Sequence, residues 1–412
     1  MSSNGKQVVI TGIGVIAPNG IGKENFWEAL EKGRSGIGPA TLIDTTYFKT
    51  KLAGECKEFH PEEFLGKKGL RNLDRTTTLV CSAAKLAIDD ANLSISEENS
   101  YSIGVITATT LSVSWDMIKF TKEEVEAGFQ FINPALFPPT TINFPSSQLS
   151  IRYHIKGFNT TISTGFTAGL DALKYGVDFI KWGRAKAVLV AGVESINFSN
   201  YVGFYKVGFL AGINGEEISC PFDKRHNGII LGEAGVVLVL EDKESALRRG
   251  VNIYAEVLGV KSSFDAYRIS KYQPQAEGLK QCIVGALKAG GISEEGIDYI
   301  CAAANSVPQQ DRLETKAIKD VFHIYAKKIP VSSIKSMVGE SISAAGLLQV
   351  CAGIRAINKQ KIPPTVNYQY PDSECDLDYV ANKSRTQEVK YVLVNCFGPD
   401  GHNTSAIIGK LT

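Results

Sequence analysis

The sequence has little that would attach the chain to a membrane or to nucleic acid. No stretch of it approaches the roughly 18 consecutive apolar residues of a membrane span. Positive and negative side chains nearly cancel, with 44 Lys plus Arg against 43 Asp plus Glu, so no overall field favours an anionic partner. The N-terminal MSSNGKQ leads straight into the apolar VVITGIGVIA, without the pattern of a secretion signal. We therefore expect a soluble, cytoplasmic protein with neither a nucleic-acid nor a membrane partner.

Metal-binding patterns are missing as well. The eight cysteines are scattered without a CxxC pair, and the five histidines form no HExxH motif. Several cysteines lie in apolar runs, which predicts buried, reduced thiols. We expect no metal site and no cofactor.

What the sequence does contain is a regular alternation of strand and helix patterns, typical of a layered α/β fold. The helices after Gly165 and Ser341 both begin with small residues, and this weak symmetry predicts two pseudo-repeated halves, residues 1–250 and 251–412. The predicted strands cover residues 7–17, 102–109, 158–164, 187–195, 235–241, 252–260, 298–304 and 390–397. The predicted helices cover residues 24–33, 76–93, 168–183, 276–291, 311–322 and 341–360.

One short stretch, ISTGFTAGLDALKYG at residues 162–176, predicts a strand that turns at Gly165 into a buried helix. An enzyme would place a nucleophile at such an elbow, because the free N–H groups and the dipole of the helix N-terminus stabilise an anion. Phe166 stands there instead. Its side chain has no lone pair and no acidity, so it cannot carry an acyl group.

Motifs spread over nearly the whole chain resemble those of the β-ketoacyl synthases, which have the thiolase fold. They are VVITGIGVIAPNG at the start, PFDKRHNGIILGEAGVVLVLED (221–242), KSMVGESISAAG (335–346) and NCFGPDGHNTS (395–405). The resemblance implies a thiolase-like layered αβαβα fold. It also implies decarboxylative Claisen condensation, which in the family uses a cysteine thiolate and two histidines.

The chain departs from the family motifs where that chemistry is carried. The nucleophile motif ISTAC has become residues 162–166, ending in Phe166. NAHGTSTPxND has become residues 301–311, with Ala303 in place of histidine, and KSxxGHxxxAAG retains Lys335 but has Glu340 in place of histidine. In the loop motif NSFGFGGxN, Pro399 replaces an aromatic residue. We predict no catalytic residue at these vestigial positions, and structural roles for the motif residues that remain: Lys335, Asp311, Glu233 and Gly232.

Loss of the cysteine is typical of one branch of the family, the chain length factors of type II polyketide synthases, although glutamine is common there at the position of Phe166. The resemblance implies a catalytically inactive subunit that pairs with an active ketosynthase α subunit, meets an acyl carrier protein through that complex, and sets polyketide chain length. It also places a dimer interface on one segment, composed of Phe158, Asn159, Thr160, Thr161, Ile162, Ser163 and Thr164. Obligate interfaces of this kind bury on the order of 2,000 to 5,000 Å².

Two segments of the relatives, matching residues 112–121 and 133–137, meet the other subunit's acyl pocket. The resemblance therefore implies candidates for ending the acyl tunnel: Ser114, Trp115, Met117, Ile118, Leu136 and Phe137. Ordinary packing is the alternative role for each of them. Phe166 itself has two interpretations: it fills the vestigial site, or it lines the far end of the tunnel.

Two other functions are compatible with the sequence. In the first, the chain is an acyl-transfer enzyme with a relocated nucleophile, Cys301 or Cys396, and Glu340 as the base. In the second, it is a homodimeric scaffold that binds acyl groups or a carrier protein without a catalytic partner.

Overall fold

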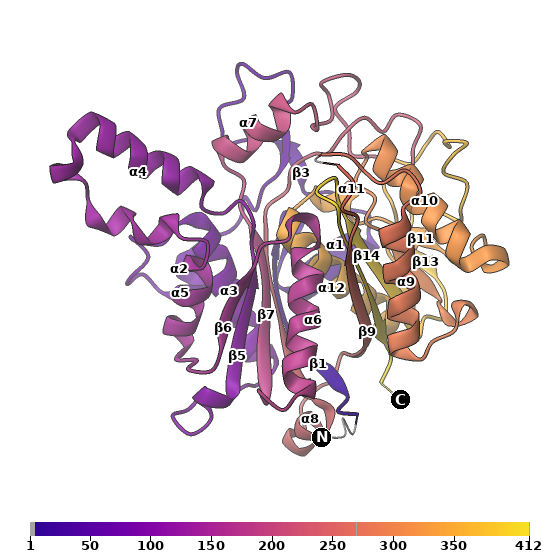
Figure 1. Ribbon diagram of the computed structural model, residues 1–412, viewed down its shortest axis with the longest axis horizontal. Helices are drawn as coiled ribbons and strands as arrows, with labels where there is room; N and C mark the ends of the chain where they lie inside the picture. The colour runs from indigo at the N-terminus through magenta and orange to yellow at the C-terminus, as the bar shows by residue number, and fades with distance from the viewer. Residues whose placement is uncertain (1–4, 269, 412) are drawn as a thin grey trace.

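A computed structural model describes residues 5–268 and 270–411, which form one mixed sheet with helices between and outside its two halves (Figure 1). The strands run in the order β11-β10-β14-β15-β9-β1-β8-β7-β5-β6, with β2 paired to β1. Their bounds are β1 Val8–Ala17, β2 Gly20–Ile21, β5 Ile103–Ala108, β6 Asn159–Ile162, β7 Ala187–Glu194, β8 Ala234–Asp242, β9 Ala255–Phe264, β10 Tyr299–Cys301, β11 Val331–Ser332, β14 Tyr391–Phe397 and β15 His402–Gly409. Two short ribbons lie outside the sheet: β3 Ile37–Pro39 with β4 Leu52–Gly54, and β12 Lys361–Ile362 with β13 Arg385–Thr386.

The two halves of the sheet repeat one topology. The order β6-β5-β7-β8-β1 corresponds to β11-β10-β14-β15-β9, and in each half the first two pairings are parallel and the next two antiparallel. Only two residue pairs, Val9 with Glu256 and Ile10 with Ala255, join β1 to β9. The pairing confirms the predicted α/β fold with two pseudo-repeated halves. The boundary at residue 250 stays a prediction.

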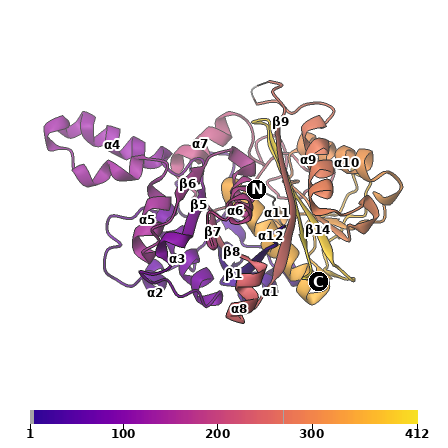
Figure 2. The ribbon, with the colours of Figure 1, turned by 60° about the horizontal axis from the view of Figure 1, so that its bottom comes forward.

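The helices complete five layers (Figure 2). Helices α6 (Ala168–Lys181) and α12 (Ala345–Lys359) contact each other between the two halves, α3 (Arg75–Asp90) covers the outside of the first half, and α9 (Glu277–Gly290) with α10 (Pro308–Phe322) covers the second. The small residues at the starts of α6 and α12 allow this approach. A Cβ on Gly169 would lie 2.7 Å from the Ser343 carbonyl oxygen, and one on Gly346 would lie 2.8 Å from Cγ of Leu170.

A helical arm, residues 114–140, projects from the body of the molecule (Figure 1). It consists of α4 (Ser114–Ala127) and three short 3₁₀ turns, η2 Phe129–Phe131, η3 Pro134–Leu136 and η4 Pro138–Thr140, none of which contains a buried residue. Its exposed apolar side chains are Met117, Ile118, Val125, Phe129, Phe131 and Phe137. The remaining α-helices are α1 Lys23–Glu31, α2 Pro61–Leu65, α5 Phe144–Tyr153, α7 Phe198–Lys206, α8 Lys243–Arg249 and α11 Lys335–Val338.

The structure confirms the buried, free state predicted for all eight cysteines. It also differs from the predictions in the second half of the chain, where β10 is shorter than the predicted strand and β15 has no predicted counterpart. β15 is a buried strand, although its first four residues, HNTS, are polar. Within the described residues, no helix is long and apolar enough to cross a bilayer.

Candidate functional site

The elbow forms where the sequence predicts it. After β6, Gly165 adopts a φ of +60°, the 3₁₀ turn η5 spans Gly165–Thr167, and α6 begins at Ala168. Phe166 is only 7% exposed and lies in a hydrophobic cluster with Ile196, Ile229 and Ile342. The Phe204 ring meets it edge-on, with centroids 6.5 Å apart. Hydrocarbon therefore fills the position at which the family motif has its thiol.

One buried carboxylate, Asp171 of α6, fixes the shape of the elbow. Its Oδ2 accepts hydrogen bonds from the Thr164 and Thr167 hydroxyls at 2.5 and 2.8 Å. Its Oδ1 accepts from Ser262 of β9 and Thr404 of β15 at 2.5 and 2.7 Å. The turn in the first half is thus tied to two strands of the second, so it is a rigid part of the core.

Glu340, in place of the second histidine, forms a buried ion pair. Its Oε2 lies 2.7 Å from Lys335 Nζ and accepts a hydrogen bond from Asn305 Nδ2 at 3.0 Å, and its Oε1 accepts from the Ile342 N–H at 2.9 Å. Burial is the largest single influence and lowers the pKa of Lys335, but the charge and hydrogen bond of Glu340, with the charges of Cys396 and Glu314, together outweigh it, so the net direction is upward. Three donors already engage the Glu340 carboxylate. If Glu340 took up a proton as a base, the buried Lys335 ammonium would lose its charged partner.

Ala303, in place of the first histidine, contributes only its backbone. Its N–H donates to Glu314 Oε1 at 2.9 Å, and its carbonyl accepts from Lys335 Nζ at 2.8 Å and Gln310 Nε2 at 3.1 Å. Glu314 also accepts from the Ala304 N–H at 2.8 Å. Burial raises the pKa of Glu314, these N–H donors partly offset the rise, and the net pKa is about 7. The methyl group of Ala303 cannot transfer a proton or polarise a carbonyl.

Asp311 and Glu233, two other motif residues that the chain retains, have polar partners in the core. Asp311 accepts from the Phe222 N–H at 2.8 Å and faces His226 Nδ1 at 3.0 Å, while His226 Nε2 lies 3.2 Å from Asp372. These contacts hold the PFDKRHNG segment, residues 221–228, against α10. Glu233 accepts from Arg75 Nε at 2.8 Å.

Asp400, in the loop between β14 and β15, is a site residue that the sequence analysis missed. A Cβ on Gly165 would lie 1.9 Å from Asp400 Oδ2, so the carboxylate lies directly against the elbow although the residue as a whole is exposed to solvent. Loss of surrounding water raises the Asp400 pKa, while nearby His402 and the N–H groups of His402 and Phe166 lower it. One signal was available in the sequence, because the family loop motif has glycine at this position.

The two thiols considered as relocated nucleophiles are inaccessible. Cys301 lies in β10 and Cys396 in β14, both at most 1% exposed. Burial raises the Cys301 pKa to about 12 and raises that of Cys396 further. Reactive cysteines have the opposite setting, a lowered pKa and access to solvent.

The tunnel candidates all lie on the arm. Trp115 is half-buried against Phe198, with ring centroids 6.0 Å apart, and exposed Phe137 contacts Phe120 at 5.9 Å. A groove of about 660 Å³ along α4 is lined by Ser114, Met117, Ile118, Thr121, Lys122, Val125, Glu126 and Ser199. Leu136 is half-buried. Their role in a tunnel stays a prediction.

The predicted interface segment includes an edge strand, since β6 pairs with β5 alone among the described strands. Besides Thr164, which donates to Asp171, two more of its side chains have partners within the chain. Phe158 stacks on Phe179 with centroids 4.0 Å apart, and Asn159 Nδ2 donates to Ser150 Oγ at 2.6 Å. Ser163 is exposed. The outer backbone edge of β6 therefore remains available for pairing.

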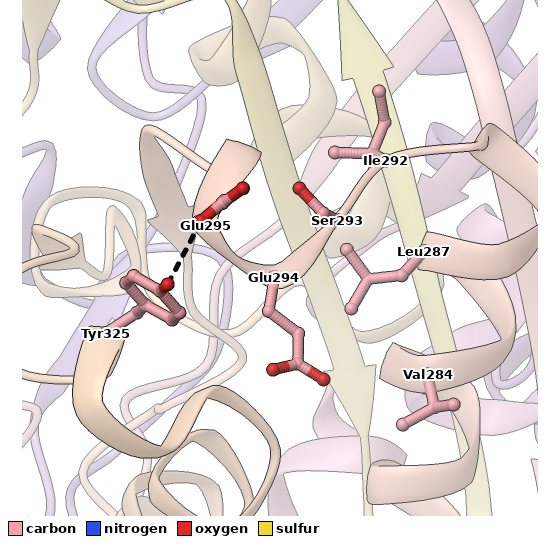
Figure 3. Close-up of a pocket in the computed structure, with 7 residues that line it drawn as sticks. All are labelled: Val284, Leu287, Ile292, Ser293, Glu294, Glu295 and Tyr325. Carbon is pink, nitrogen blue, oxygen red and sulfur yellow. Dashed lines mark hydrogen bonds between the residues drawn. The ribbon is translucent and has the colours of Figure 1, made fainter.

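A separate hollow of about 370 Å³ lies on α9 and two neighbouring 3₁₀ turns (Figure 3). Its lining residues are Val284, Leu287, Ile292, Ser293, Glu294, Glu295 and Tyr325. The Tyr325 hydroxyl donates to Glu295 Oε2 at 3.0 Å, and this carboxylate raises the Tyr325 pKa. None of the lining residues is a thiol or an imidazole, so the hollow does not substitute for the vestigial site.

Comparisons with known proteins agree with this geometry. Residues 5–246 match the N-terminal domain and residues 254–369 the C-terminal domain of the β-ketoacyl synthases. A 3-oxoacyl-acyl-carrier-protein synthase 2 from Coxiella burnetii is 36% identical over 98% of this chain and 99% of its own length.

Two solved structures are also similar. The ishigamide ketosynthase/chain length factor has a TM-score of 0.92 and 32% identity, covering 99% of this chain and 100% of that chain. A type II polyketide synthase acyl-carrier protein in complex with its ketosynthase, AntDE:AntF, includes a chain with a TM-score of 0.90 and 30% identity, over 98% of this chain and 100% of that chain. Motifs, topology and both comparisons lead to one conclusion: the chain belongs to the β-ketoacyl synthase family.

Proposed function

We propose that this protein is a non-catalytic, chain length factor-type subunit of a type II polyketide synthase, acting in the cytoplasm. It pairs with an active ketosynthase α subunit, shapes the acyl tunnel of the heterodimer and so sets product length. It meets an acyl carrier protein through this heterodimer. No metal or cofactor is required of this chain.

The observation that carries the proposal is the joint replacement of all three chemical groups. Acyl transfer by this family needs a thiolate and two imidazoles. Here the three positions hold a buried phenyl ring at Phe166, a methyl group at Ala303, and a carboxylate at Glu340 already paired with Lys335. A changed mechanism accounts for one such loss more easily than for three.

Two surface features support a partner of the same fold. The edge of β6 offers unpaired backbone groups, and the arm presents apolar side chains that a lone chain leaves in water. Of the two similar structures, one is a ketosynthase/chain length factor and the other is an acyl-carrier protein in complex with its ketosynthase. By analogy, α4 and the segment at residues 133–137 would meet the partner's acyl pocket.

Phe166 fits the role of a filler better than that of a tunnel wall. It is buried among apolar side chains of its own chain. An empty site of the same shape would cost about 24 cal/mol per Å³ of cavity. The tunnel candidates, by contrast, lie on the exposed arm.

The relocated-nucleophile alternative receives no support from the burial of Cys301 and Cys396. The homodimeric scaffold remains the alternative, because an exposed edge strand and an apolar arm would also suit a second copy of this chain.

Co-expression is the test of this proposal. The chain is expressed alone and together with a cysteine-bearing ketosynthase from the same source, and each preparation is assayed for partner content by mass spectrometry and for thioester elongation. We expect a stoichiometric heterodimer whose activity is abolished by removing the partner's nucleophilic cysteine. A stable homodimer that ignores the ketosynthase would favour the scaffold, and elongation by the isolated chain would refute the proposal.

A further inference from the structure

Two departures from the family motifs, far apart in the sequence, fit each other in space. Where ISTAC has alanine this chain has Gly165, and where NSFGFGGxN has its second glycine this chain has Asp400. The alanine methyl and the carboxylate could not coexist, because a Cβ on Gly165 would lie 1.9 Å from Asp400 Oδ2. Glycine at position 165 makes room for the Asp400 side chain.

The Asp400 carboxylate lies directly over the turn that precedes α6. A Cβ on Gly398 would lie 2.9 Å from Asp400 Oδ1 and 2.5 Å from Cδ2 of Phe166, so both groups press on the same small backbone segment. The His402 N–H points at Oδ1 from 3.4 Å, and the Phe166 N–H also interacts with the carboxylate. The Phe166 N–H lies at the positive end of α6, where an anion is stabilised.

We propose that the Asp400 carboxylate, an anion supplied by the chain itself, occupies the position where the elbow would otherwise polarise the carbonyl of an acyl thioester. Restoring a thiol at position 166 would therefore not restore a competent acyl site, because a negative charge would face both the thiol and the backbone N–H of residue 166. This inference rests on the vestigial state of the elbow in the proposed function. It does not depend on the partner or on control of product length.

A double-mutant cycle in the full-length chain tests the steric fit. Gly165→Ala lowers the thermal unfolding midpoint through both the positive φ and the clash with Asp400. Adding Asp400→Gly removes the clash and recovers most of the loss. Glu295→Gln, which removes a carboxylate from the distant hollow of Figure 3, recovers none of it. Simple additivity of the Gly165→Ala and Asp400→Gly effects would overturn the proposal.

A second measurement tests the charge. In the variant Phe166→Cys, alkylation of the introduced thiol by iodoacetamide is followed against pH by peptide mass spectrometry, with little background from the eight buried native cysteines. A like charge nearby raises a thiol pKa by about 1 unit or more, so adding Asp400→Asn moves the midpoint down by about 1 pH unit. At neutral pH the rate then rises about tenfold.

Other titrating groups near Asp400 need a control. His402 and Tyr272 are the ionisable side chains coupled to it. The Asp400→Asn comparison is therefore repeated in a His402→Gln background, where the same downward shift is expected. Identical midpoints with and without Asp400 would overturn the proposal. The co-expression test above depends on the partner and not on these midpoints, so the two ideas can fail separately.

Discussion

Two turns of this molecule lie at corresponding places in the repeat, and each has a different kind of side chain where the family motif has its thiol or imidazole. The turn before α6 is filled by hydrocarbon, the Phe166 ring among apolar neighbours. The turn before α12 is filled by charge, with Glu340 paired to Lys335. The Phe166 ring is held in place by fit, whereas the Glu340–Lys335 pair is stable only while both partners are present. A vestigial site can thus be closed by packing or by electrostatic neutralisation, and the two closures should respond differently to mutation.

The largest expected effect comes from breaking the ion pair on one side. Glu340→Ala leaves the Lys335 ammonium buried and unpaired, which costs about 3–5 kcal/mol of unfolding free energy. Chemical denaturation measures the loss. The double variant Glu340→Leu/Lys335→Met is the matched control and should lose much less, because it removes both charges. Equal losses in the two variants would show that the pair contributes through shape alone.

Removing the ring at the other turn should cost somewhat less. Phe166→Ala opens a cavity in the apolar cluster and should lower the unfolding free energy by about 3 kcal/mol, whereas Phe166→Leu keeps most of the volume and should cost below about 1.5 kcal/mol. Both variants should leave product formation by the heterodimer unchanged. If a well-folded Phe166→Leu variant lost elongation in the heterodimer, the Phe166 ring would instead line the tunnel.

The region around Ala303 should make stability depend on pH. Burial raises the Glu314 pKa to about 7 from an ordinary value of 4.5, so the folded state binds this proton more tightly than the unfolded state does. The contribution is complete below about pH 4.5 and is lost as the pH rises towards 7, by roughly 3 kcal/mol. Denaturation midpoints from pH 4.5 to 7.5 should show a shallower fall with Glu314→Gln. Glu194, whose pKa burial also raises to about 7, supplies a similar slope that remains. An unchanged slope would contradict the assignment.

Substitutions on the arm should have the smallest effects on stability. Their effect on the length of the product should not be small. Trp115→Ala and Phe137→Ala remove partly or largely exposed rings and should cost below about 1 kcal/mol. In the heterodimer they should lengthen the products, as mass spectrometry of the released polyketides would show. Tyr47→Ala, at a fully exposed ring outside the arm, is the control. Unchanged product length in both arm variants would remove these side chains from the tunnel.

Much of the fold could be predicted from local pattern, and part of the site could not. The elbow follows from a strand run, a glycine and helical spacing. β15 escaped prediction because its first residues are polar, and their burial depends on partners in other strands, such as Asn395, which accepts from Ser405 at 2.8 Å. The fit of Asp400 to Gly165 depends on the approach of two distant segments, which no local pattern reports. A structural role for Lys335 was predicted, but its pairing with Glu340 required the three-dimensional turn.

The unpaired edge of β6 beside an apolar arm has a consequence for the cell as well as for the molecule. Under the proposed function, a copy without its partner would expose both an unpaired strand edge and an apolar surface, which promote aggregation and attract chaperones and proteases. Such a polypeptide is best made in matched amounts with the subunit that shields it. Any surplus would be cleared, and the stoichiometry of the pair would be enforced by quality control.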